Sequence, residues 1–197
     1  ESLRQRGYLE QNQDIHLTVT RLSWYLNYYQ RISSEALRAA FLADIAPLLG
    51  GKEAIQEAIR RDQNDILKRF TIDSETALNK NLTENLYTSM ICVLNRIPVI
   101  ICGKPGTSKT LASRILVANL RGRNSSDDYF RRQPELIFVS YQGSRTSTSR
   151  GVEQCFQKAK QWLKTSGKPL PVVIFDEIGL AEQSPHNPLK VLHNHLE

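Results

Sequence analysis

The residues best suited to chemistry lie between positions 103 and 110, where two glycines, two lysines and two threonines gather in one short segment. Glycines allow bare backbone N–H groups to curve around an anion. The second lysine, Lys109, can supply a positive charge to the β- and γ-phosphates of a nucleotide, and Thr110 can supply a hydroxyl to Mg²⁺. The predicted phosphate-binding residues are Gly103, Lys104, Pro105, Gly106, Thr107, Ser108, Lys109 and Thr110.

The order of these residues is that of a P-loop, with one departure. The P-loop pattern places a glycine directly before the lysine, whereas this chain has Ser108 before Lys109. That position lies where the loop turns into the following helix, so we expect a small residue to be tolerated there. A chance glycine- and serine-rich turn is the alternative for this segment taken alone.

A second motif lies 67 residues after Lys109. An apolar run over 172–175 ends in two neighbouring carboxylates, Asp176 and Glu177. In P-loop proteins the aspartate at such a position holds Mg²⁺, and the adjacent glutamate polarises the water that attacks the γ-phosphate. We therefore predict Thr110 and Asp176 as Mg²⁺ ligands and Lys109 and Glu177 as catalytic residues. A strand that ends in Asp-Glu is common by itself, and the P-loop upstream is what favours a nucleotide site.

Alternating strands and helices are predicted to position these residues. Three apolar runs predict buried strands, over 97–102, 136–141 and 172–177. Apolar residues at helical spacing predict helices over 109–122 and 152–163. The carboxyl ends of parallel strands form the edge of the sheet where ligands bind. The predicted fold class is therefore α/β, a three-layer P-loop core with a parallel sheet, preceded by an all-helical segment.

The first part of the chain carries only helical patterns. Apolar residues recur at helical spacing in three segments, over 15–29, 34–49 and 52–70. A further amphipathic helix is predicted to begin near Asp73 and to lead into the first strand. This start marks the predicted domain boundary, with a helical lid or connector over 1–72 and the α/β domain over 73–197.

The patterns also predict how these helices are capped and buried. Ser33 or Ser34 suits the N-cap of the 34–49 helix. Leu37 and Leu48 belong to the expected buried face of that helix. The aromatic stripe around Trp24 is expected to pack in the core rather than to stack on nucleic-acid bases.

Composition sets limits on the function. Residues 1–75 hold 10 basic and 11 acidic side chains, a net charge of −1, whereas residues 76–197 hold 16 and 9, a net charge of +7, so the positive charge of the chain lies in the nucleotide half. No basic run is interleaved with aromatic residues, which makes nucleic acid an unexpected partner. No apolar run reaches the length of a membrane span. Three scattered cysteines suit reduced thiols in a cytoplasmic protein, and the start without Met or a signal pattern predicts an internal piece of a longer chain.

Three segments together resemble the mysterin family, giant RING-type ubiquitin ligases with a dynein-like string of AAA+ modules. They are the loop from Ile97 to Ala112, the end of the second strand at 140–142, and the segment from Asp176 to His193. The Lys-Pro-Gly-x-Ser-Lys form of the loop and the Gly-Leu-Ala-Glu-x-Ser-Pro run at 179–185 carry the specificity. The resemblance covers 76–197 and accounts for Ser108, because the family loop is similar there.

The resemblance implies ATP hydrolysis in the cytoplasm by one AAA+ module of a large chain that also ubiquitinates substrates. Its implied partners are ATP, the neighbouring AAA+ modules of the same chain and, through the parent protein, the ubiquitination machinery. No RING zinc spacing is present. AAA+ sheets resemble a 5-1-4-3-2 strand order, so the fourth strand, the sensor residue, the arginine finger and the lid are expected after Glu197.

The predicted function is Mg²⁺-dependent ATP binding and hydrolysis that drives conformational change in a giant ubiquitin ligase. The alternative is a module that binds ATP without turnover and acts as a structural switch, although Glu177 favours hydrolysis. A nucleic-acid motor is a third interpretation, which salt-dependent DNA binding would favour. No guanine-specific Asn-Lys-x-Asp motif is present.

Overall fold

The computed structural model describes residues 15–165 and 167–196. The chain divides into two compact units, one that ends at Thr88 and one that begins at Ser89. The predicted lid or connector over 1–72 therefore lies in the first unit, and its first fourteen residues are outside the described part. The domain boundary near Asp73 stays a prediction.

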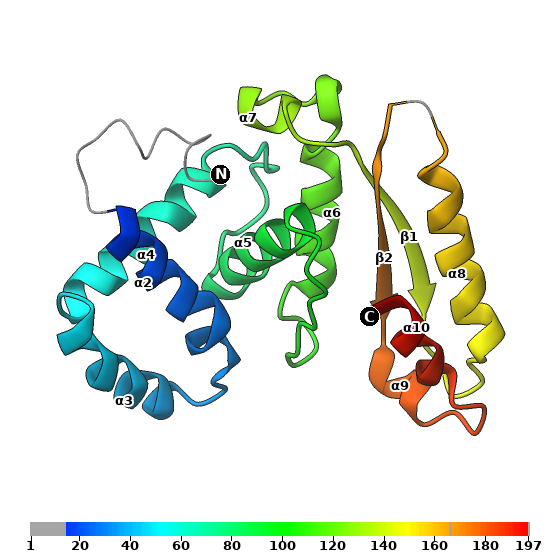
Figure 1. Cartoon of the computed structure of the whole chain (residues 1–197), viewed down its shortest axis with the longest axis horizontal. Helices are drawn as coiled ribbons and strands as arrows, with labels where there is room; N and C mark the ends of the chain where they lie inside the picture. Colours follow the sequence, from blue (N-terminus) through cyan, green and yellow to red (C-terminus); the bar gives the residue numbers. More distant parts are fainter. Residues whose placement is uncertain (1–14, 166, 197) are drawn as a thin grey trace. The chain divides into compact units, whose positions relative to one another are not determined.

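The first unit is helical (Figure 1). Its elements are α2 (Ile15–Asn27), α3 (Glu35–Ile45), α4 (Lys52–Leu67) and the larger part of α5 (Lys80–Leu94). Ser34 caps α3, since its hydroxyl accepts a hydrogen bond from the backbone N–H of Leu37. The three helices predicted in this part of the chain, and one of the two predicted caps, are thus confirmed.

One hydrophobic cluster of the first unit lies between α2, α3 and α4. Its buried residues are Leu42, Ile45, Ala46, Leu49 and Ile55, with Leu17, Trp24, Phe41 and Ile59 packed against them. The Trp24 ring lies 4.9 Å from Tyr28 and 5.9 Å from Phe41, centroid to centroid, and Tyr25 is buried, so this part of the aromatic stripe packs as predicted, whereas Tyr28 is exposed. The predicted burial of Leu37 and Leu48 is wrong, because both side chains are exposed.

The helix predicted to begin near Asp73 begins instead at Lys80. The side chain of Asn79 accepts a hydrogen bond of 2.9 Å from the backbone N–H of Leu82, which satisfies one of the free donors in the first turn of α5. This cap marks the start of the helix, and residues 71–79 before it are neither helix nor strand.

The second unit holds a parallel pair of strands, β1 (Leu136–Gln142) and β2 (Leu170–Asp176). They pair in register from Leu136 opposite Leu170 to Gln142 opposite Asp176. The helices of this unit are α6 (Lys109–Asn119), α7 (Asp128–Arg131), α8 (Ser149–Trp162), α9 (Ile178–Glu182) and α10 (His193–Leu196). No described helix has both the length and the apolar character that crossing a bilayer requires.

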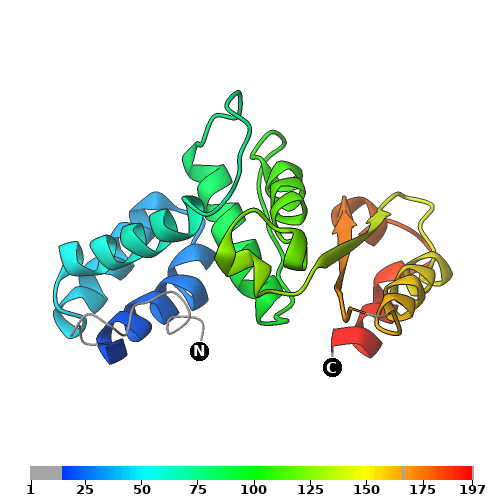
Figure 2. The ribbon, with the colours of Figure 1, turned by 90° about the horizontal axis from the view of Figure 1, so that it is seen from above.

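Helices lie on both sides of the strand pair (Figures 1 and 2). Helix α8 connects the two strands and packs on both of them, with Val152, Cys155 and Ala159 buried. Helix α6 contacts β1 from the other side and buries Ala112, Ile115 and Leu116. The described part of the second unit is therefore a small parallel α/β arrangement. It agrees with the predicted α/β class, but its sheet has two strands and not the full three-layer core that was predicted.

The strand predicted over 97–102 is not formed. The described sheet contains only β1 and β2, and Ile97, Val99 and Ile100 are exposed. An isolated strand leaves its backbone N–H and C=O groups without a ladder partner, so an apolar run alone does not make one. In the 5-1-4-3-2 order of the AAA+ resemblance, the neighbours of this strand are the fourth and fifth strands, and neither is among the described elements.

Candidate nucleotide-binding site

The ammonium group of Lys109 reaches back to residues 103–107 of the loop over 103–110. This group donates hydrogen bonds to the carbonyl oxygens of Gly103 at 2.9 Å and Lys104 at 3.0 Å, and to the hydroxyl of Thr107 at 3.3 Å. None of these partners is charged, and no described carboxylate forms an ion pair with Lys109. The positive charge is therefore available to an anion.

Two residues in the left-handed region shape this loop. Gly106 has a φ of 77° and Ser108 a φ of 59° with ψ of 21°. Glycine adopts this conformation freely, whereas for serine it costs about 1–2 kcal/mol. Ser108, the one departure from the P-loop pattern, therefore occupies a backbone position that glycine would fill without strain.

Gly103 lies close to the side chain of Thr107. A Cβ at this position would lie 2.7 Å from the hydroxyl oxygen of Thr107. That hydroxyl also donates to the carbonyl of Lys104 at 2.8 Å. The loop thus closes tightly on itself beside the Lys109 ammonium group, and a side chain at Gly103 would fill the space.

The loop also offers free backbone donors. The N–H groups of Gly106, Ser108, Lys109 and Thr110 donate to no acceptor in the described parts of the chain. Helix α6 begins at Lys109, so the positive end of its dipole points into the loop. Free N–H groups, a helix N-terminus and an uncommitted ammonium group together fit the phosphates of a nucleotide. Thr110, in the first turn of α6, is exposed and has its hydroxyl available.

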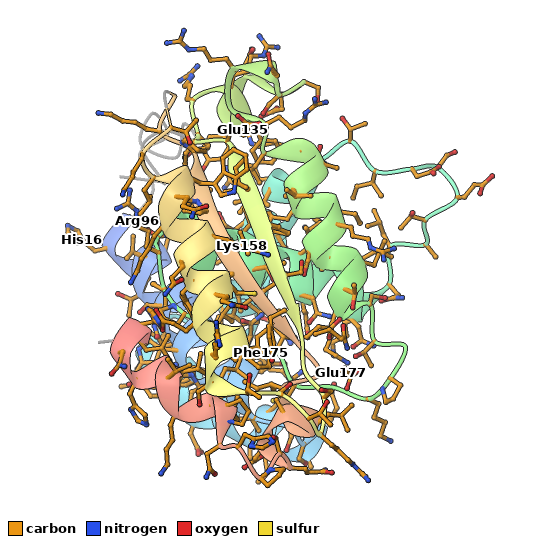
Figure 3. The ribbon with its side chains drawn as sticks, turned by 90° about the vertical axis from the view of Figure 1, so that its right-hand side faces the viewer. His16, Arg96, Glu135, Lys158, Phe175 and Glu177 are labelled. Atoms are coloured by element: carbon orange, nitrogen blue, oxygen red, sulfur yellow. The ribbon has the colours of Figure 1, made fainter. Side chains whose placement is uncertain are left out.

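The two predicted acidic residues lie where β2 ends. Asp176 is the last residue of β2 and is half-buried, and Glu177 follows it and is exposed. The Oδ1 atom of Asp176 accepts the backbone N–H of Glu177 at 3.0 Å. Glu177 has φ of 52° and ψ of 43°, a left-handed conformation that is costly for a side chain of this size. Figure 3 labels Glu177 at this end of the strands.

The two groups of residues belong to the same unit and lie toward the same end of it. The N-terminal end of α6 and the carboxyl ends of β1 and β2 point in one direction in Figure 1. No hydrogen bond or ion pair joins Lys109 or Thr110 to Asp176 or Glu177 in the described residues. The loop residues and the two carboxylates therefore do not contact each other through these bonds, but both lie toward the carboxyl ends of the strands.

Sequence reasoning missed the contacts that hold Glu177 in place. Gly143 follows β1 and donates its N–H to the carbonyl of Asp176 at 2.8 Å. The hydroxyl of Ser184 donates to the carbonyl of Ser147 at 2.7 Å, and both serines are buried. Only the register of the two strands brings Gly143, in the loop over 142–149, opposite Glu177.

Comparison with known proteins places this small parallel α/β unit in a family. A family model described as "RNF213 AAA domain" matches residues 75–197. The chain therefore belongs to the RNF213 AAA domain family. This membership confirms the resemblance to the mysterin family, since mysterin is RNF213. AAA domains bind nucleotides in general.

Curated relatives support the same family. The chain is 32% identical over 173 residues to "E3 ubiquitin-protein ligase rnf213-beta" of zebrafish (Danio rerio), a match that covers 86% of the chain. It is 36% identical over 146 residues to "E3 ubiquitin-protein ligase RNF213" of mouse (Mus musculus), covering 73% of the chain, and 37% identical over 145 residues to its human (Homo sapiens) counterpart, covering 72%. The matches span about 3% of the length of each of these relatives.

Ser108→Gly should raise the free energy of unfolding by about 1 kcal/mol. The substitution removes the left-handed strain of a non-glycine residue, and the greater freedom of glycine in the unfolded chain offsets part of the gain. Equilibrium unfolding in urea measures the change.

Ser113→Gly is the matched control. Ser113 lies inside α6, where glycine costs about 0.5 kcal/mol relative to serine, so the same chemical change should lower the stability. Equal losses of stability in both variants would show that Ser108 is not strained.

Proposed function

We propose that this chain is part of an AAA+ module that binds Mg²⁺-ATP and hydrolyses it. The observation that carries the proposal is the Lys109 ammonium group, which is held by neutral oxygens at the N-terminal end of α6 and surrounded by free backbone N–H groups. A site with this charge and this many donors suits a triphosphate better than a neutral ligand.

Lys109 would bind the β- and γ-phosphates. Its present partners, the carbonyls of Gly103 and Lys104, are neutral. Phosphate oxygens are charged acceptors, and hydrogen bonds between two charged groups are about twice as strong as neutral ones. The ammonium group can therefore leave the carbonyls for the phosphates, while the N–H groups of Gly106, Ser108 and Thr110 bind the remaining oxygens.

Thr110 and Asp176 would hold the metal ion. A hydroxyl and a carboxylate are oxygen ligands of the kind Mg²⁺ takes, usually with several waters retained. Asp176 has one oxygen engaged by the N–H of Glu177, which orients the carboxylate and leaves its second oxygen available in the described structure. Bound Mg²⁺ would supply positive charge that neutralises the phosphates.

Glu177 would act as the general base. Its carboxylate is exposed at the end of β2, and its hydrogen-bonded neighbour Asp176 fixes the backbone at that point. A carboxylate within hydrogen-bond reach of a water accepts the proton that the water loses on attack. The left-handed backbone of Glu177 ends the extended strand and leads directly into α9.

The module would work inside a much longer protein. The relatives are named as E3 ubiquitin-protein ligases, and the chain matches only about 3% of their length. We infer that it belongs to such a ligase, that it resides in the cytoplasm, and that neighbouring AAA+ modules are its partners. The part that transfers ubiquitin would lie elsewhere in that protein.

Lys109→Ala should weaken ATP binding roughly tenfold to a hundredfold, since it removes a charged donor worth about 1.5–3 kcal/mol. The control is Lys158→Ala, which removes an exposed lysine of α8 outside the loop and should leave affinity unchanged. Isothermal titration calorimetry on a protein that contains the complete module gives both affinities. Equal ATP binding by the wild type and the Lys109→Ala variant would refute the site.

Substitutions of the two carboxylates, Asp176 and Glu177, should affect ATP binding and hydrolysis differently. Asp176→Asn should weaken Mg²⁺-ATP binding and slow turnover together, because it removes a metal ligand. Glu177→Gln should keep ATP bound and slow hydrolysis by about 10²–10⁴-fold, the usual scale for a general base. Single-turnover hydrolysis in the full-length protein, where a neighbouring arginine can complete the site, separates these effects. Turnover by Glu177→Gln at the wild-type rate would favour the non-hydrolysing switch.

A further inference from the structure

Gly143 lies directly opposite the carboxylate pair, across the parallel strands. The last paired residues are Gln142 of β1 and Asp176 of β2. Gly143 continues the ladder by one step, since its N–H donates to the carbonyl of Asp176 at 2.8 Å. The residue after β1 thus meets the turn that begins at the end of β2.

The space at Gly143 excludes any side chain. A Cβ there would lie 2.3 Å from the carbonyl oxygen of Glu177, 2.9 Å from its carbonyl carbon and 3.0 Å from the carbonyl oxygen of Asp176. All three atoms belong to the backbone, so none can rotate away. Gly143 has no positive φ. Close approach, and not conformational freedom, is what requires glycine at this position.

The atom that a side chain at Gly143 would displace is the first acceptor of α9. The carbonyl of Glu177 accepts the N–H groups of Leu180 at 3.0 Å and Ala181 at 3.4 Å. Glu177 itself is in the left-handed region, a conformation that persists only where the surroundings hold it. Glu177 is held in place by the contact with Gly143 on one side and by the first turn of α9 on the other.

A second contact fixes the same turn farther along. Ser184, beyond α9, donates to the carbonyl of Ser147 in the loop that Gly143 begins. The hydroxyl of Ser147 accepts the N–H of Ser144 at 2.9 Å, which folds the loop onto itself. The loop after β1 therefore holds the chain on both sides of the α9 turn.

We propose that Gly143 is a positioning residue for Glu177: the missing side chain lets the loop after β1 close against the Glu177 carbonyl and set the direction of the carboxylate. The inference rests on the proposed role of Glu177 in hydrolysis. Displacement of a reacting group by about 1 Å can cost on the order of 10²-fold in rate. The three atoms nearest to a Cβ at Gly143 belong to Asp176 and Glu177, and none belongs to the loop over 103–110 that would bind the phosphates.

The test compares Gly143→Ala with Gly179→Ala in the full-length protein. Gly179 follows Glu177 by two residues, and a Cβ there would meet no atom within 4 Å, so the control makes the same chemical change in open space. ATP affinity is measured by calorimetry and hydrolysis by single turnover. We expect Gly143→Ala to keep ATP affinity within about threefold and to slow hydrolysis by about 10–100-fold. Gly179→Ala should match the wild type in both.

Two results would overturn the inference. Hydrolysis by Gly143→Ala at the rate of Gly179→Ala would show that the contact does not position Glu177. A parallel loss of affinity and rate would show a merely structural role. If Gly143→Ala does not fold, Ser184→Ala replaces it, because this variant removes one hydrogen bond from the same turn. It should keep ATP affinity and slow hydrolysis by a smaller factor than Gly143→Ala. Hydrolysis by Ser184→Ala at the wild-type rate would then overturn the inference.

Glu177→Gln in the same assay separates this inference from the proposed function. If Glu177→Gln is as fast as the wild type, the proposed hydrolysis fails and the role of Gly143 falls with it. If Glu177→Gln is slow and Gly143→Ala is not, hydrolysis at Glu177 stands and only the positioning role is lost.

Discussion

The parallel pairing of β1 with β2 is the interaction on which the candidate site depends. It joins Leu136–Gln142 to Leu170–Asp176 in register, so the two strands end side by side. That coincidence brings the loop after β1 against the turn after β2, where Gly143 contacts the backbone of Glu177. Helix α8 makes the pairing possible, since it spans the crossover and buries Val152 and Ala159 against the strands. A shift of one residue in register would move Gly143 away and reverse the side-chain faces of the strand.

The second constraint is the charge in the loop before α6. The ammonium group of Lys109 bonds only to neutral oxygens in the described structure, and these are weaker partners than a phosphate. The backbone beside it is strained at Ser108, which is in the left-handed region, and Gly103 lies close to the side chain of Thr107. Local strain of this kind is common where a ligand binds. Both constraints direct polar groups to one end of the second unit, where the proposed nucleotide would lie.

Much of this arrangement could be predicted from the sequence, because apolar periodicity and residue chemistry are local. The patterns predicted β1, β2, α6 and α8 close to their observed bounds, and Lys109 lies in its loop with its charge unpaired by any described carboxylate.

The apolar run over 97–102 led to the wrong prediction of a strand, since a strand needs a hydrogen-bonded neighbour that its own sequence does not reveal. The start of α5 was missed because the cap at Asn79 outweighs the apolar pattern before it. The role of Gly143 was missed because a glycine between Gln142 and Ser144 reads as an ordinary loop residue until the register is known. The roles of the site residues in catalysis remain predictions.

Lys109 and the loop around it are proposed to bind the phosphates of ATP. The most direct measurement is a structure of the full-length protein with Mg²⁺ and a non-hydrolysable ATP analogue. We expect phosphate oxygens on the Lys109 ammonium group and on the backbone N–H groups of Gly106, Ser108 and Thr110, with the carbonyls of Gly103 and Lys104 released. A structure in which the other modules hold nucleotide, while Lys109 keeps its carbonyl partners and no phosphate touches this loop, would contradict it.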